Sequence, residues 1–307
     1  MIKTETVFVL GAGASKPYGF PTGAELRTRI CTELMLGYAA FERLTECGHN
    51  QTDIEHFRAS FEQSAVASID MFIAFRSEFK EIGEHTIATL LLPAEKLTNL
   101  TKENWYHFLW HEMISGATTP ELLLQNKVKF ITFNYDRSLE QFLLSAIQNV
   151  YGLTPETSFS YLSQIKIRHV YGSLGDYDHE CGYRYGEQSN GDFRLMILAA
   201  QRSIKTVPSI RGSADEICAD WLANAQRVFV LGFGFDPTNC VQIRLTSACS
   251  KAPKPHTPKQ IFASAYLLTL AEKNWCEANA CAPRQGGLIW TNGDSLDLLR
   301  DRRDLLN

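Results

Sequence analysis

The sequence predicts an α/β protein in which a parallel sheet is covered by helices on both faces. Six short apolar segments of strand length are spread along the 307 residues. Segments with helical spacing separate most of them, and strands that alternate with helices are typical of a parallel sheet. Several of the apolar segments end in glycine or polar clusters, and ligands of such sheets bind beyond the carboxyl ends of the strands. We therefore expect a Rossmann-like sheet with a ligand site at that edge.

The first expected strand is the apolar run at residues 7–10, which leads directly into Gly-Ala-Gly-Ala-Ser at residues 11–15. A segment at 24–36 follows with Leu and Ile at helical spacing, and Thr22 stands where an N-cap is expected. This part of the chain predicts a strand, a glycine loop and a helix.

Residues 37–126 have a nearly continuous helical pattern, for example at Ile54, Phe57 and Phe61. The segment contains no convincing alternating strand. We therefore predict a helical insertion subdomain at 37–126, and a Rossmann-like domain formed by 1–36 and 127–307.

The remaining strands are expected where β-branched and aromatic residues concentrate again. These strands are residues 128–133, 165–170, 227–231, 260–263 and 287–291. A helix at about 137–149 follows the first of them, and glycine turns or polar clusters follow three others. Each such turn is a candidate to line the ligand site.

Composition excludes several classes of protein. Hydrophobic residues make up 45% and charged residues 21%, as in an ordinary folded chain and unlike a disordered one. A net charge of −4 gives no general attraction to nucleic acid. The longest mostly apolar stretch, residues 261–271, is about half of the roughly 20 residues that a membrane span needs, and no signal-peptide pattern opens the chain. We expect a cytoplasmic protein that does not contact membranes.

No metal site is predicted. The eight cysteines include no C-x-x-C pair, so no zinc module is indicated. His107 and His111 lie four residues apart with Glu112 next to them, but the order is not H-E-x-x-H. The tryptophans at 105 and 110 indicate that this helix packs in the core.

The glycine loop is the first candidate for ligand binding. Gly11 and Gly13 allow a tight turn and a close approach of the backbone to a pyrophosphate, whose oxygens the following amides can bind. Lys16 stands where a complete G-x-G-x-x-G would have its third glycine. A plain tight turn is therefore the alternative interpretation.

Four segments together give a more specific pattern. They are Gly11-Ala12-Gly13-Ala14-Ser15, Gly19-Phe20-Pro21, Thr132-Phe133-Asn134-Tyr135-Asp136, and His169 followed by Gly172-Ser173. In order and spacing the chain resembles the sirtuin superfamily over most of residues 5–300. It has Thr22-Gly23-Ala24 where the protein deacylases have Asp-Phe-Arg, Phe133 where they have Gln, and no four-cysteine zinc module. These differences match a divergent bacterial sirtuin-like branch, whose members hydrolyse NAD in antiphage defence.

The resemblance implies an NAD hydrolase that needs no metal and takes NAD as its substrate. The bond between nicotinamide and ribose would be cleaved to give nicotinamide and ADP-ribose or a cyclic isomer. Asn134 would hold a ribose hydroxyl or the attacking water, Asp136 would stabilise the positive charge on the sugar, and His169 would be the general base. The residues alone leave other roles open: Asn134 as a turn residue, Asp136 as a helix cap and His169 as a structural histidine.

The resemblance and the turns after the strands also predict the residues that bind NAD. They are Gly11, Ala12, Gly13, Ser15, Phe20, Pro21, Thr22, Gly172, Ser173, Gly232, Phe233, Gly234 and Asn292. The last four would line the adenosine half, although plain strand-to-helix turns are an equal alternative. Asp70 resembles a residue of the divergent branch that could approach the nicotinamide, and the alternative for it is a solvated helix start.

Partners are implied by the resemblance alone. Members of the branch often work as oligomers, and stand-alone members suggest a homo-oligomer with a ring ATPase partner of the HerA type. One alternative is a regulatory or assembly subunit that binds NAD or ADP-ribose without catalysis. Another is an NAD-dependent protein deacylase, which the missing zinc module and the missing Asp-Phe-Arg disfavour.

Overall fold

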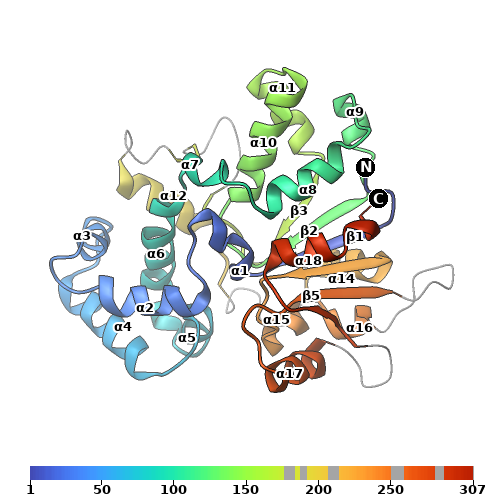
Figure 1. Cartoon of the computed structure of the whole chain (residues 1–307). Coiled ribbons are helices and arrows are strands. Elements are labelled where there is room, and N and C mark those ends of the chain that lie inside the picture. Colours follow the sequence, from blue (N-terminus) through green and yellow to red (C-terminus); the bar gives the residue numbers. More distant parts are fainter. Residues whose placement is uncertain (176–183, 187–191, 207–213, 250–258, 281–286, 307) are drawn as a thin grey trace.

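The protein is built around a six-stranded sheet in which all strands are parallel. The computed structural model describes residues 1–175, 184–186, 192–206, 214–249, 259–280 and 287–306 (Figure 1). The strands are β1 (Thr6–Leu10), β2 (Val128–Thr132), β3 (Lys166–His169), β4 (Arg227–Leu231), β5 (Gln260–Ser264) and β6 (Ile289–Thr291). Their order, β3-β2-β1-β4-β5-β6, is that of a doubly wound Rossmann-like sheet. The predicted fold class and the six predicted strands are confirmed.

The register of the central strands brings their last residues to one level. Leu10 of β1 pairs with Thr132 of β2 and with Leu231 of β4. Thr132 also pairs with His169 of β3. The chain therefore leaves these four strands at the same edge of the sheet, and the loops that follow them lie together.

Helices fill the connections between the strands. Between β1 and β2 lie α1 (Ala12–Ser15), α2 (Gly23–Glu33), α3 (Ala39–Glu46), α4 (Gln51–Gln63), α5 (Ile69–Phe75), α6 (Lys80–Leu91), α7 (Leu97–Leu100), α8 (Trp105–Ile114) and α9 (Pro120–Leu123). After β2 come α10 (Ser138–Tyr151) and α11 (Pro155–Leu162), and after β3 come α12 (Phe193–Ser203) and α14 (Glu216–Asn224). The remaining helices are α15 (Pro237–Gln242), α16 (Leu245–Cys249), α17 (Leu270–Ala280) and α18 (Ser295–Asp301). Short 3-10 turns lie at 16–18, 77–79, 92–94 and 303–305.

The start of α2 shows why the chain turns into a helix where it does. Thr22 accepts a hydrogen bond from the backbone N–H of Glu25, whose carboxylate in turn accepts one from the N–H of Thr22. This capping box satisfies amides that a helix start leaves without partners. The predicted N-cap is thus present, and it defines where α2 begins.

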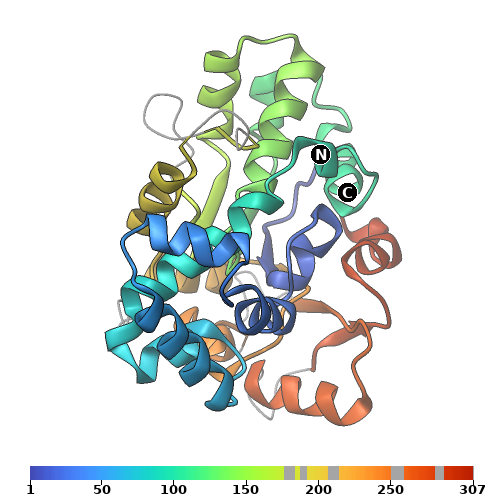
Figure 2. The same ribbon diagram turned by 90° about the vertical axis from the view of Figure 1, so that its left-hand side faces the viewer.

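The two faces of the sheet pack into two apolar clusters. Phe8 of β1 stacks between Phe130 of β2 and Phe229 of β4, with centroid distances of 5.3 Å on both sides. This cluster also contains Trp105 of α8 and side chains of α10 and α18. Val7 and Val9 of β1 alternate to the opposite face and join the cluster of α3 to α6. Figures 1 and 2 show α2 to α6 gathered as a helical group at one side of the molecule, with α12 beside α6.

The described ranges also bear on membrane insertion and metal binding. No helix there is long and apolar enough to span a membrane. In the same ranges no three or more His, Cys, Asp or Glu side chains are grouped in a way that could hold a metal ion.

Candidate functional site

A cavity of about 750 Å³ lies at the carboxyl edge of the sheet. It is lined by the turns after β1 and β4, by residues that follow β2, β3 and β5, and by α2 and α5. Between β1 and β4 the order of the strands reverses direction, which is where ligands bind in open α/β sheets. The volume is typical of pockets for small molecules and cofactors.

The glycine turns after β1 and β4 interlock through their backbones. The N–H of Gly11 donates to the carbonyl of Leu231 and that of Gly13 to the carbonyl of Gly232, each at 3.0 Å. A Cβ on Gly11 would lie 2.5 Å from the Gly232 oxygen, and one on Gly232 would lie 2.1 Å from the Ala14 nitrogen. Gly232 also has a φ of +56°. Packing of one turn on the other therefore requires glycine, and it leaves both turns open to the cavity.

Asn134 is the residue of the predicted catalytic set that lines the cavity. Its side-chain amide donates to the carbonyl of Gly11 at 2.9 Å and to the hydroxyl of Ser15 at 2.8 Å. Because both amide protons are used in this way, Oδ1 is left as an acceptor for a ligand.

Asp136 lies behind Asn134 and is not among the cavity-lining residues. Its carboxylate accepts from the N–H of Ser138 at 3.1 Å and from the Ser138 hydroxyl, and it is also hydrogen-bonded by Ser15. Burial raises the pKa of Asp136, and these hydrogen bonds oppose the shift. The structure thus places Asp136 where it supports the start of α10 and bonds to Ser15.

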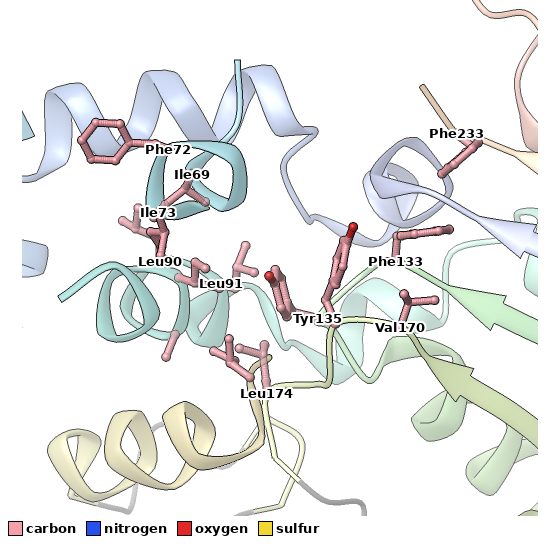
Figure 3. Close-up of a cluster of buried hydrophobic side chains, with 14 of the residues drawn as sticks. Ile69, Phe72, Ile73, Leu90, Leu91, Phe133, Tyr135, Val170, Leu174 and Phe233 are labelled. Carbon is pink, nitrogen blue, oxygen red and sulfur yellow. The ribbon is translucent and has the colours of Figure 1, made fainter. Parts of the chain in front are cut away.

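Tyr135 and Arg137 make their contacts with the helical segment. The Tyr135 hydroxyl donates to the carboxylate of Asp70 on α5. The Arg137 guanidinium donates to both carboxylate oxygens of Glu95, at 3.0 and 2.7 Å. Figure 3 shows Tyr135 between the apolar side chains of α5 and α6, such as Ile69 and Leu91, and those at the strand ends. The loop after β2 is therefore held from two sides.

His169 lies at the end of β3, outside the set of cavity-lining residues. Its Nδ1 is 2.8 Å from the backbone oxygen of Asn134, and its Nε2 is 2.6 Å from a carboxylate oxygen of Glu140. Burial lowers the pKa of His169, but Glu140 and the Asn134 carbonyl outweigh burial and the net shift is upward. Both ring nitrogens of His169 are therefore engaged by oxygen atoms of the protein.

Tyr171, two residues further on, lines the cavity instead. Its hydroxyl donates to the side-chain oxygen of Asn239 at 2.5 Å, and burial raises its pKa. The next residue, Gly172, has a φ of +70°, and a Cβ there would lie 1.9 Å from the Ser203 oxygen. Gly172 and Ser173, both predicted to bind NAD, are not lining residues, and the Ser173 hydroxyl donates to the Gly175 carbonyl at 2.8 Å.

The other predicted binding residues divide into two groups. Those that line the cavity are Gly11, Ala12, Gly13, Thr22, Gly232, Phe233 and Gly234. Phe20 is instead buried in the cluster around Phe8, and Pro21 lines a separate surface depression. Asn292 accepts a hydrogen bond from Lys273 and does not line the cavity. Ser15 does not line it either, and its hydroxyl accepts a hydrogen bond from the Asn134 amide. The structure thus places these four predicted residues outside the cavity lining.

Acidic side chains supply the charge of the cavity. Among the lining residues in the described ranges, Asp70 and Asp236 are the charged ones. Burial raises the pKa of Asp70, which the hydrogen bond from Tyr135 opposes. Asp236 caps α15 by accepting from the N–H groups of Thr238 and Asn239. Sequence reasoning singles out Asp70 and also the segment 232–236, which follows β4 directly and ends at Asp236. It misses Asn239 and Tyr171.

Comparisons with models of known protein families and with curated protein sequences gave no match to this chain. Its function is therefore inferred from the cavity and from the side chains around it.

Proposed function

We propose that the chain hydrolyses NAD at the bond between nicotinamide and ribose. The observation that carries the proposal is the composition of one cavity, whose lining includes two interlocked glycine turns together with Asn134 and Asp70. A glycine turn at the switch point of a doubly wound sheet is a typical place for a dinucleotide. The resemblance to the NAD-hydrolysing sirtuin-like branch supports the same substrate.

Departure of nicotinamide leaves positive charge on the ribose, so a nearby carboxylate lowers the barrier. Asp136 does not line the cavity, and we assign this role to Asp70. A water oxygen bonds to the anomeric carbon as the bond to nicotinamide breaks, and nicotinamide leaves with that electron pair as a neutral molecule. Asp70 accepts the proton of the water and releases it to solvent. Asn134 Oδ1 accepts a hydrogen bond from a ribose hydroxyl or from the water.

The rest of NAD would lie along the glycine turns. Backbone around Gly11 to Gly13 and the start of α2 at Thr22 can face the pyrophosphate, since a helix N-terminus favours negative charge. Phe233 and Tyr266 offer aromatic surface for the adenine on the β4 and β5 side. These contacts form the binding part of the proposal.

Release of nicotinamide from NAD by the purified chain tests the proposal. Asp70→Asn and Asn134→Ala should each lower kcat by about 10²- to 10⁴-fold, the usual contribution of a positioned catalytic group. Asn292→Ala is the matched control, because Asn292 lies outside the lining set and should keep the wild-type rate. Equal NAD consumption by Asp70→Asn, Asn134→Ala and the wild type would sink the proposal. Tight binding of NAD without release of nicotinamide would favour a regulatory subunit.

The biological setting is a further part of the proposal and is supported by the resemblance alone. We propose a homo-oligomer in antiphage defence that a ring ATPase of the HerA type controls. Light scattering on the chain with and without such an ATPase tests the assembly, and a monomer in both samples would count against it.

A further inference from the structure

We infer that His169 is a positioning residue that is protonated at neutral pH, and that it holds the backbone of Asn134 through one ring nitrogen while Glu140 holds the other. Its effect on NAD cleavage rests on the proposed function, whereas its protonation state does not. The observation is the pair of short contacts on either side of the ring, 2.8 Å to the Asn134 oxygen and 2.6 Å to Glu140.

The two contacts require two N–H donors. A backbone carbonyl can only accept, and an ionised carboxylate can only accept. A neutral imidazole carries a single N–H, so it could satisfy one of these partners and would face the other with a lone pair. The imidazolium satisfies both partners, and its charge is balanced by Glu140 in a buried place.

The charged groups around the ring fit this state. Glu140 faces it from α10, and Asp136 acts on it from the loop after β2. The nearest cation in that loop, Arg137, is bonded to Glu95 in a buried ion pair. The surroundings of His169 are therefore anionic on the sides from which α10 and the loop approach.

Asn134 is then fixed at two points. His169 holds its backbone oxygen, and Gly11 and Ser15 hold its side-chain amide. The orientation of Oδ1 toward a ligand depends on both anchors. Loss of the proton from His169 would release either Asn134 or Glu140, and the position of Oδ1 would no longer be defined.

The pH dependence of kcat distinguishes a positioning imidazolium from a general base by its sign. A general base loses activity as the pH falls and it becomes protonated. A positioning imidazolium loses activity as the pH rises through its pKa, which Glu140 raises. We expect the wild type to lose activity on the alkaline side, and Glu140→Gln to move that loss to lower pH by about one to three units. His169→Gln should lower kcat about 10- to 100-fold, keep KM for NAD, and lack the alkaline loss. An alkaline loss that stays in place in Glu140→Gln or persists in His169→Gln would overturn the inference.

Nitrogen NMR of the imidazole rings gives a second readout that needs no turnover. The His169 signals are identified by their absence in His169→Gln. In the wild type at pH 7 both ring nitrogens should carry protons, and a single protonated nitrogen would overturn the inference. If NAD is not cleaved while both nitrogens are protonated, the proposed function fails and the assignment of His169 stands.

Discussion

Replacing Arg137 by methionine removes the cation from an ion pair in which both side chains are at most 2% exposed. Glu95 then loses the guanidinium that contacts both of its carboxylate oxygens, at 3.0 and 2.7 Å. Burial raises the pKa of Glu95, and Arg137 opposes that shift in the wild type, although the net shift stays upward. In Arg137→Met the opposition is gone, so we expect the folded protein to take up a proton on Glu95.

The free energy needed to keep Glu95 protonated in the folded state determines how much stability Arg137→Met loses. In the unfolded chain a glutamate ionises with a pKa of about 4.3, and each pH unit above that value costs about 1.4 kcal/mol if the folded state stays protonated. Because the pKa of Glu95 is already raised in the wild type, the loss relative to the wild type should reach at most about 4 kcal/mol at pH 7 and at most about 1 kcal/mol at pH 5. A loss of about 3 to 5 kcal/mol is also usual when one partner of a buried pair is removed.

Urea unfolding at pH 5 and at pH 7, followed by circular dichroism and tryptophan fluorescence, measures both values. The control is the double variant Glu95→Met with Arg137→Met, which removes both charges. The free energy of unfolding of this double variant should be higher than that of the wild type or at most about 1 kcal/mol lower, and it should depend little on pH. If Arg137→Met loses the same free energy at both pH values, or if the double variant is as unstable as the single one at pH 7, the reasoning is refuted.

Three other predictions follow from the site and the core. Gly11→Ala should lower the melting temperature and weaken NAD binding in calorimetric titration, because its Cβ meets the Gly232 oxygen at 2.5 Å. A Cβ at Gly234 meets nothing within 4 Å, so Gly234→Ala should keep the wild-type melting temperature. The kcat for NAD cleavage should fall as the pH drops through the raised pKa of Asp70, since the protonated acid cannot accept a proton from water. A kcat that stays constant until the pH falls to the ordinary aspartate pKa of about 3.9 would argue against Asp70 as the base. Phe8→Ala should cost about 3 to 5 kcal/mol in urea unfolding because Phe8 is fully buried between two aromatic rings. Phe75→Ala, at a side chain 71% exposed, should stay within about 0.5 kcal/mol of the wild type.

The sheet could be predicted from the sequence because its signal is local. Central parallel strands are buried on both faces, so β1 and β4 appear in the sequence as unbroken apolar runs. The glycine turns follow those runs directly, and their position at the edge of the sheet is a consequence of strand direction. Neither inference needs knowledge of the contacts between distant segments.

The side chains that face the cavity could not all be predicted in this way. His169 and Tyr171 are two residues apart near the end of β3, yet it is Tyr171 that lines the cavity. Which of the two side chains lines the cavity depends on where β3 ends and on Glu140, which contacts the His169 ring from α10. Asp70 lines the cavity from α5, and Tyr135 of the loop after β2 donates a hydrogen bond to it, which is a contact between distant parts of the chain.

The spacing of Asn134 and Asp136 has a structural cause that also explains why their roles differ. Alternate residues of the loop after β2 contact different neighbours. Asn134 and Asp136 bond to the glycine loop, at Gly11 and Ser15, whereas Tyr135 and Arg137 bond to acidic side chains of the helical segment. An Asn and an Asp two residues apart are thus what this loop needs to stay attached to the turn after β1, and only Asn134 reaches the cavity. Because Tyr135 and Arg137 attach the same loop to the helical segment, the position of Asn134 depends on that segment as well as on the sheet.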